Sequence, residues 1–169
     1  MVKKIGHAVQ LIFAVMCTAS LFFFVPAMAS ESDCDEFTFF SDWGNRILDA
    51  DTALIKLFQV SPESLGRFHI IVRLDHIASS VANYRNIIGV EQMYQRNINK
   101  PLTGSAKDMV KMLKKDSLEQ LIKGIDSGRS EIGGEQLLVK DQLIKRQLSD
   151  TGDLLQDLFF NLAPCLGRI

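Results

Sequence analysis

The chain has 169 residues, 47% of them hydrophobic, and its 19 basic and 20 acidic side chains give a formal net charge of −1. This length suits one domain with a substantial core. The near-neutral charge argues against a nucleic-acid-binding protein, and the apolar residues that recur along the chain argue against a disordered one.

Residues 1–29 have the organisation of a secretory signal peptide. Lys3 and Lys4 form a basic start, and an uncharged apolar run covers residues 11–25. The sequence Ala-Met-Ala then occupies residues 27–29, and signal peptidase reads small residues three positions and one position before its cut. The apolar run is also shorter than the about 20 residues of a membrane-spanning helix.

We therefore expect cleavage after Ala29 and a mature domain of residues 30–169, exported to the periplasm or the exterior. In that form the protein would have no membrane span. The alternative is an uncleaved N-terminal anchor, because residues 8–29 are just long enough to cross a bilayer.

Cysteine usage agrees with export. Cys17 lies within the signal segment, which leaves Cys34 and Cys165 near the two ends of the mature chain. An even number of cysteines in an oxidising compartment predicts a disulfide between them. Closing a loop of roughly 130 residues would stabilise the fold by up to about 5 kcal/mol in the chain-entropy model. An intermolecular disulfide is the alternative, whereas a metal site is disfavoured because neither cysteine has a second Cys or a His at ligand spacing.

Apolar periodicity predicts four helices in the mature chain. The first runs from about residue 35 to 59, with a break at Gly44 as an alternative. Ser61-Pro62-Glu63 is a strong start signal, because it places a hydroxyl cap, a proline and an acid in the first turn. The second helix is therefore expected over residues 62–97, with Gly89 as a point where it could kink or end.

The third and fourth helices are separated by glycines. The third is expected to begin after Gly104 and to end at residues 126–129, where Asp-Ser-Gly-Arg reads as a helix end. Gly133 and Gly134 would then form the connection. The fourth helix is expected over residues 135–162 and ends just before Pro164.

These helices predict an all-α, up-down-up-down four-helix bundle. In this topology the first helix begins at the end of the bundle where the fourth finishes, so Cys34 and Cys165 would lie close together. The expected disulfide and the expected fold support each other, and we predict a bundle closed by a disulfide between the chain ends.

The charges of the last two helices also suit an antiparallel pair. With the turn near residue 130, Lys107 would lie opposite Asp153. Lys111 would then lie opposite Asp150, and surface pairs of this kind are worth about a few tenths of a kcal/mol each.

No residue pattern indicates a catalytic, metal or cofactor site. His69 and His76 are two helical turns apart, about 10 Å, which is too far to hold one ion, and Arg73 lies between them. The chain lacks a Cys-x-x-Cys-His haem motif, a Gly-x-Ser-x-Gly nucleophile elbow and a glycine-rich phosphate loop. We therefore expect a protein that is not an enzyme and that needs no cofactor or metal.

A row of four lysines follows one side of the third helix: Lys107, Lys111, Lys114 and Lys115. Acidic residues interleave with this row, so the pattern favours a solvated face of the bundle. A contact with an anionic partner or with membrane headgroups is the alternative.

Six aromatic residues gather near the expected disulfide: Phe37, Phe39, Phe40, Trp43, Phe159 and Phe160. Adjacent residues of a helix point about 100° apart, so the two rings of each Phe-Phe pair cannot both face one narrow seam. Either the core widens there into an aromatic cap, or one ring of each pair faces outward as a contact surface. The second interpretation predicts a contact surface of five of these residues: Phe39, Phe40, Trp43, Phe159 and Phe160.

These features favour an exported helical interaction protein of the cell envelope or exterior, such as an inhibitor, an accessory subunit or a protective factor. Its partner would be another exported or envelope protein, and self-association is compatible with the same aromatic surface. No nucleic-acid partner is expected. The alternative is a binding module that holds an apolar small ligand in the bundle core, with Met109 and Met112 as adaptable lining residues.

Overall fold

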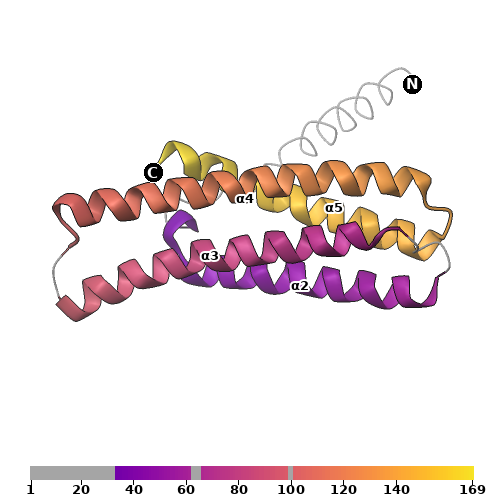
Figure 1. The fold of residues 1–169 in the computed structure, drawn as a ribbon, viewed down its shortest axis with the longest axis horizontal. Helices are drawn as coiled ribbons and strands as arrows, with labels where there is room; N and C mark the ends of the chain where they lie inside the picture. Colours follow the sequence, from indigo (N-terminus) through magenta and orange to yellow (C-terminus); the bar gives the residue numbers. More distant parts are fainter. Residues whose placement is uncertain (1–32, 62–65, 99–100) are drawn as a thin grey trace, which may run out of the picture.

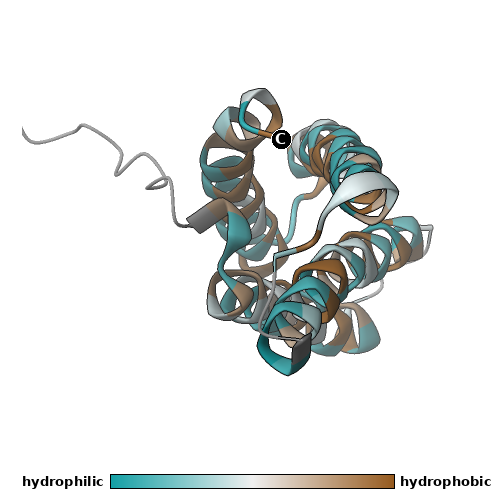
Figure 2. Ribbon diagram, turned by 90° about the vertical axis from the view of Figure 1, so that its left-hand side faces the viewer, coloured by the Kyte–Doolittle hydropathy of each residue, from teal (hydrophilic) through white to brown (hydrophobic). Residues whose placement is uncertain are grey.

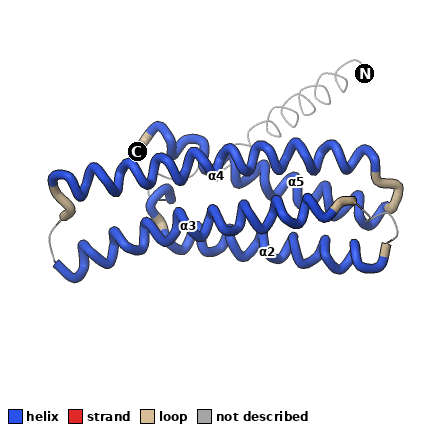
Figure 3. Tube along the Cα trace, viewed as in Figure 1, coloured by secondary structure: helices blue, strands red, loops and turns tan. Residues whose placement is uncertain are grey.

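Residues 33–61, 66–98 and 101–169 are described by a computed structural model of the chain (Figure 1). The expected signal segment and the expected helix start at Pro62 lie outside these residues. The elements, in chain order, are η1 (Asp33–Asp35), α2 (Phe37–Val60), α3 (Phe68–Ile98), α4 (Gly104–Leu138), α5 (Gln142–Leu162) and η3 (Ala163–Gly167). Within the described residues there is no strand (Figure 3).

Each long helix packs against the next one in the chain, and α5 packs back against α2. The helices run alternately up and down, which confirms the predicted bundle topology (Figure 1). Seen end-on, each helix carries both polar and apolar residues, as the amphipathic helices of a bundle do (Figure 2). Among the described residues, none of the helices is long and apolar enough to span a bilayer.

The core is a seam of side chains at steps of three and four residues, as the sequence pattern predicts. Its fully buried members include Phe40, Ile47, Leu54, Ile70, Leu74, Ile77, Tyr84, Leu118, Leu121, Ile125, Ile144, Leu148, Leu155, Leu158 and Leu162. All four helices contribute, so the hydrophobic stabilisation of each helix depends on the other three.

The first two helices differ from expectation only in their bounds. The helix α2 continues through Gly44, where an added Cβ would lie 3.6 Å from the Val81 side chain, so the glycine sits at a contact with α3. The helix α3 begins at Phe68, because Gly66 has a φ of 94°, which a right-handed helix cannot include. It then continues through Gly89 to Ile98.

The predicted turn between the last two helices was wrong by about ten residues. The helix α4 continues through Gly128, Gly133 and Gly134, and the turn lies at residues 139–141. The Asp141 side chain accepts hydrogen bonds from the first backbone N–H groups of α5, so it is the cap that starts this helix. Glycine weakens an isolated helix by about 1 kcal/mol per residue, and the packing of buried neighbours along α4 outweighs that cost.

The later turn changes the register of α4 against α5. Arg129 donates a hydrogen bond to Gln156 at 3.1 Å, and α5 ends at Leu162, so α4 residues before about 123 have no α5 residue opposite them. The predicted pairs of Lys107 with Asp153 and of Lys111 with Asp150 are therefore wrong.

The same register leaves α3 and α4 longer than their neighbours. They have 31 and 35 residues, whereas α2 and α5 have 24 and 21. Gly89 lies against Phe37, the first residue of α2, so the rest of α3 continues past the start of that helix. We call the projecting part, residues 92–98 and 101–113, the arm; Figure 1 shows it extending beyond the C-terminus. At 1.5 Å per residue, its ten α4 residues from 104 to 113 span about 15 Å.

Candidate interaction surface at the disulfide end

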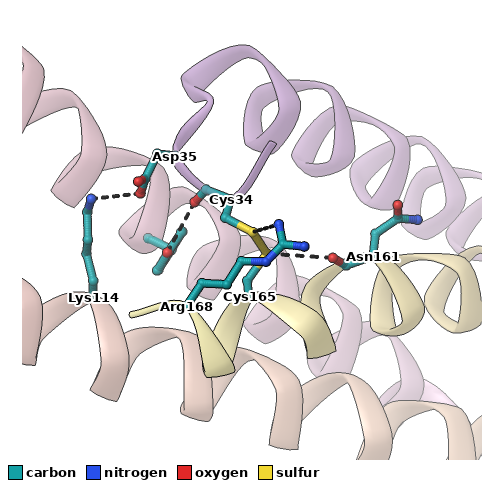
Figure 4. Close-up of a disulfide and its surroundings, with 7 residues drawn as sticks. Cys34, Asp35, Lys114, Asn161, Cys165 and Arg168 are labelled. Atoms are coloured by element: carbon teal, nitrogen blue, oxygen red, sulfur yellow. Dashed lines mark hydrogen bonds and ion pairs between the residues drawn. A yellow bond between two sulfur atoms is a disulfide. The ribbon is translucent and has the colours of Figure 1, made fainter. Parts of the chain in front are cut away.

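A disulfide joins Cys34 of η1 to Cys165 of η3, with 5.6 Å between the two Cα atoms (Figure 4). The predicted intramolecular bond is therefore present, and both cysteines are buried. The Cys34 carbonyl accepts a hydrogen bond from the hydroxyl of Tyr84 at 3.3 Å. Burial, together with the nearby carboxylates, raises the pKa of Tyr84, so the phenol stays a donor.

An ion cluster beside the disulfide ties η1 to α3 and α4. The Lys114 ammonium donates to Asp35 Oδ1 at 2.7 Å and also pairs with the Glu91 carboxylate. Burial alone would lower the pKa of Lys114, but the two carboxylates outweigh burial and leave the pKa raised. Lys114 therefore does not belong to a solvated lysine row, whereas Lys107, Lys111 and Lys115 are exposed.

Two residues of the predicted contact surface, Phe40 and Trp43, lie in the core instead. The Phe40 ring is fully buried against Tyr84, with 4.6 Å between ring centroids. Trp43 is buried, and the Arg46 guanidinium covers its ring at 4.1 Å. Phe39 is half-buried, edge-on to Phe40. These rings form an aromatic plug beneath the disulfide, which is the alternative that the sequence left open.

The aromatic pair on α5 divides as helical geometry requires. Phe159 is half-buried under the Arg129 guanidinium, which lies 5.2 Å from the ring centroid. Phe160 points outward and is 51% exposed. Of the five predicted contact residues, Phe160 alone is mostly available to a partner.

Phe37 was absent from the predicted set, and it lines a groove between the start of α2 and the arm. The other lining residues are Glu36, Thr38, Gly89, Gln92, Met93 and Arg96. The Phe37 ring packs directly against Gly89, because an added Cβ there would lie only 3.3 Å from a ring carbon. The Arg85 guanidinium covers the same ring at 5.2 Å. In the sequence, Gly89 indicates a kink or an end of the helix and gives no sign of a contact with Phe37.

The arm carries several exposed apolar side chains, of which Met93 also lines the groove. They are Met93, Tyr94, Met109, Met112 and Leu113. Met109 and Met112 therefore do not line the bundle core, which corrects their assignment as ligand-lining residues. The arm contains three basic side chains, Arg96, Lys107 and Lys111, and one acidic side chain, Asp108, so it has a basic surplus.

The two histidines line one surface pocket on α3, together with Val72, Arg73 and Glu131. His69 lies 2.9 Å from the Gly66 carbonyl and 3.7 Å from Glu135, and His76 is exposed. Close by, Arg73 pairs with Glu131 at 2.6 Å, and this hydrogen bond lowers the pKa of the Glu131 carboxyl. The contacts of His69 with Glu135 and of Arg73 with Glu131 join α3 to α4. In the part of the chain that the structure describes, no group of three or more His, Cys, Asp and Glu side chains could hold a metal ion.

One buried carboxyl remains outside these pairs. Asp51 on α2 is buried, and its Oδ1 has no hydrogen-bond partner. Burial, and then the charge of Asp75, raises the pKa of Asp51. A perturbed acid is a signal of catalytic sites when it lies in a cleft with a partner group, and Asp51 lies in the helix packing instead.

Comparison with known proteins does not assign this chain to a group: no family model, no curated protein and no solved structure matches it significantly.

Proposed function

We propose that this protein is an exported helical interaction protein that acts by contact with another protein of the envelope or exterior, as an inhibitor, accessory subunit or protective factor. The observation that carries the proposal is the groove beside Phe37, together with the exposed apolar side chains of the arm. Exposed apolar side chains in such number on one projecting part of a small protein are typical of partner interfaces.

The composition of this surface favours a protein partner. Aromatic residues, Met and Arg are enriched in protein–protein interfaces, and the groove and arm combine Phe37, Tyr94, Met93 and Arg96. Methionine is flexible and polarisable, so it adapts to a partner's shape. The chemistry of recognition is therefore apolar contact at the groove with adaptable contacts along the arm.

Several contacts hold the backbone beside the groove in place. The disulfide, the Tyr84 hydrogen bond and the Lys114 ion cluster fix η1, from which α2 and Phe37 follow. Preorganisation of this kind lowers the entropy lost on binding and so favours affinity.

The basic surplus of the arm selects an acidic partner surface. Lys107, Lys111 and Lys115 are exposed beside the apolar side chains, and like charges on a partner would be repelled. Complementary charge speeds association at low salt, so binding should weaken as ionic strength rises.

Site-specific crosslinking in the exporting cell tests the proposal. A photoreactive residue at Met93 or Met112 should give an adduct of one shared mass, whereas Gln120, exposed on the middle of α4, should give none. Met93→Glu should reduce recovery of the same partner by about tenfold, the effect of losing one interface anchor. Equal adducts at all three positions, or none at any, would contradict the proposal. An adduct with a second copy of the chain would show that this surface mediates self-association and does not bind another protein.

Export is tested separately by intact mass. The exported species should begin at Ser30, because cleavage is expected after Ala29. A full-length species held in the membrane would favour the uncleaved anchor. That result would not bear on the proposed contact surface.

A further inference from the structure

The end of the bundle opposite the disulfide carries its own cluster of exposed apolar side chains. Five of them lie beside the two helix connections at that end, namely Val60, Phe68, Leu137, Leu138 and Leu143. Each is more than half exposed, and Leu137 reaches 82%. We call this region the distal end.

The two connections of the distal end lie side by side. Arg67, just before Phe68, pairs with Glu135 at 3.0 Å, and Glu135 lies one helical turn before Leu138. Figure 1 shows the α2–α3 and α4–α5 connections at the same end of the molecule. The apolar side chains of the two connections therefore belong to one region of the surface.

Core packing does not account for these leucines. Val139 and Ile144 are buried at the α4–α5 turn and supply its hydrophobic contacts. Leu137, Leu138 and Leu143 alternate with them and face outward. Three exposed leucines within seven residues therefore need another explanation, since apolar surface left in water is unfavourable.

Basic side chains surround the cluster. Residues 56–68 and 135–146 together contain five basic and three acidic residues, although the chain as a whole has a slight acidic surplus. Glu135 pairs with Arg67, so these two residues add no net charge, and the Asp141 side chain caps α5. Lys56 and Arg146 are exposed one turn from the cluster, beside Val60 and Leu143 respectively.

We propose that the distal end rests on an anionic lipid surface. The leucines would enter the boundary between headgroups and acyl chains, and the flanking basic side chains would contact phosphates, as in interfacial membrane contacts. The inference is independent of the proposed function: it places a membrane contact at one end and leaves the partner surface at the other.

The composition of the distal end favours a lipid surface over a protein partner and over a second copy of the chain. Its exposed residues are mainly aliphatic and flanked by Lys and Arg, whereas the groove and arm carry the Met and aromatic residues typical of protein interfaces. A second copy meeting end to end would bring the basic residues of both copies together, which like-charge repulsion opposes.

Vesicle flotation of the exported protein is the first test. Vesicles with about one quarter phosphatidylglycerol in phosphatidylcholine should bind the protein more tightly than pure phosphatidylcholine, and added salt should narrow the difference. Leu137→Ser with Leu138→Ser should lower the partition coefficient by about tenfold or more. Met109→Ser with Met112→Ser, equally polar changes at exposed positions of the arm, should leave it unchanged within about twofold.

A positional reporter makes the test independent of any loss of binding. Trp43, the chain's one tryptophan, is buried near the other end and supplies a constant background. Leu138→Trp should add fluorescence that brominated phospholipids quench, and Met109→Trp should add fluorescence that they do not quench. This contrast holds whatever the N-terminal segment does, because it reports which end meets the lipid.

The outcomes that overturn the proposal are distinct. Absence of vesicle binding overturns it, as does equal quenching at Leu138→Trp and Met109→Trp. A concentration-dependent dimer lost in Leu137→Ser with Leu138→Ser, without vesicle binding, would assign the distal end to a second copy. Met93→Glu should leave vesicle binding intact, so failure of the partner surface and failure of the lipid surface are distinguishable.

Discussion

Lys114 of α4 donates a hydrogen bond to Asp35 of η1, which lies 79 residues earlier in the chain. This contact holds η1 against the α3–α4 pair. Its other partner, Glu91, comes from α3, so one buried ammonium joins three elements. The contact lies beside the disulfide (Figure 4), and Glu36, the residue after Asp35, lines the groove. The ion cluster therefore connects the stability of the bundle end to the shape of the candidate surface.

Removal of the ammonium should destabilise the fold. Lys114→Met would leave the Glu91 carboxylate half-buried without its partner, and we expect a loss of about 1–3 kcal/mol in the free energy of unfolding. The measurement is urea denaturation at neutral pH. Lys115→Met is the matched control, because that side chain is exposed and should change stability by less than about 0.5 kcal/mol. Equal effects of the two changes would show that the cluster contributes nothing specific.

The two aromatic populations at the disulfide end should respond differently to truncation. Phe40→Ala removes a fully buried ring and should cost about 3–5 kcal/mol. Phe160→Ser changes a ring that is 51% exposed and should cost less than about 1 kcal/mol. Thermal and urea unfolding measure both. A cost of 3 kcal/mol or more for Phe160→Ser would make that ring structural, and the contact surface would then be confined to the groove and arm.

These aromatic residues show what sequence alone could resolve. Adjacent pairs such as Phe159-Phe160 indicate that one ring faces outward, but they do not say which, because that depends on the register against neighbouring helices. The seam of Ile47, Leu54 and Leu74 was predictable, since each recurs at helical spacing. The disulfide was predictable because even cysteine count and bundle topology independently placed both cysteines at one end.

The arm was not predictable either, because its length depends on where the α4–α5 turn lies. Gly133 and Gly134 have the composition of a turn, whereas the real turn at residues 139–141 contains no glycine. Packing of Ile132 in the core keeps α4 helical past its glycines, and propensity cannot anticipate such tertiary support. A turn near residue 130 would make α4 about as long as α5 and would leave no projecting part. The error in the turn position therefore also excluded the arm and its exposed side chains.

Asp51 should make stability depend on pH. Its pKa is raised in the folded state, so the folded protein binds a proton more tightly than the unfolded chain does. The favourable contribution of the protonated form is present at low pH and is lost as pH rises above the ordinary carboxyl range. Asp51→Asn removes the charge, so it should stabilise the protein at pH 7 by about 1 kcal/mol and have little effect near pH 4.

Thermal unfolding of Asp51→Asn and wild type across this range checks the sign. Comparing the two proteins at each pH is necessary because Glu131, whose pKa is lowered, contributes the opposite slope to both. Asp49→Asn is the matched control, since Asp49 is exposed on the same helix. A stabilisation that is larger at pH 4 than at pH 7 would mean that Asp51 is ionised without penalty in the fold.

Two glycines of α4 should respond in opposite ways to the same substitution. Around Gly133 no atom lies within 4 Å of an added Cβ, so Gly133→Ala should stabilise the helix by about 0.5–1 kcal/mol. At Gly128 the Cβ would lie 2.9 Å from Ile77 Cδ1 and 3.3 Å from Leu155 Cδ1. The gain in helix propensity is then opposed by overpacking of about 1–3 kcal/mol, so Gly128→Ala should be neutral or destabilising. Urea unfolding of both variants tests the close approach of α3 and α5 to α4, and equal stabilisation would show that these helices can separate without cost.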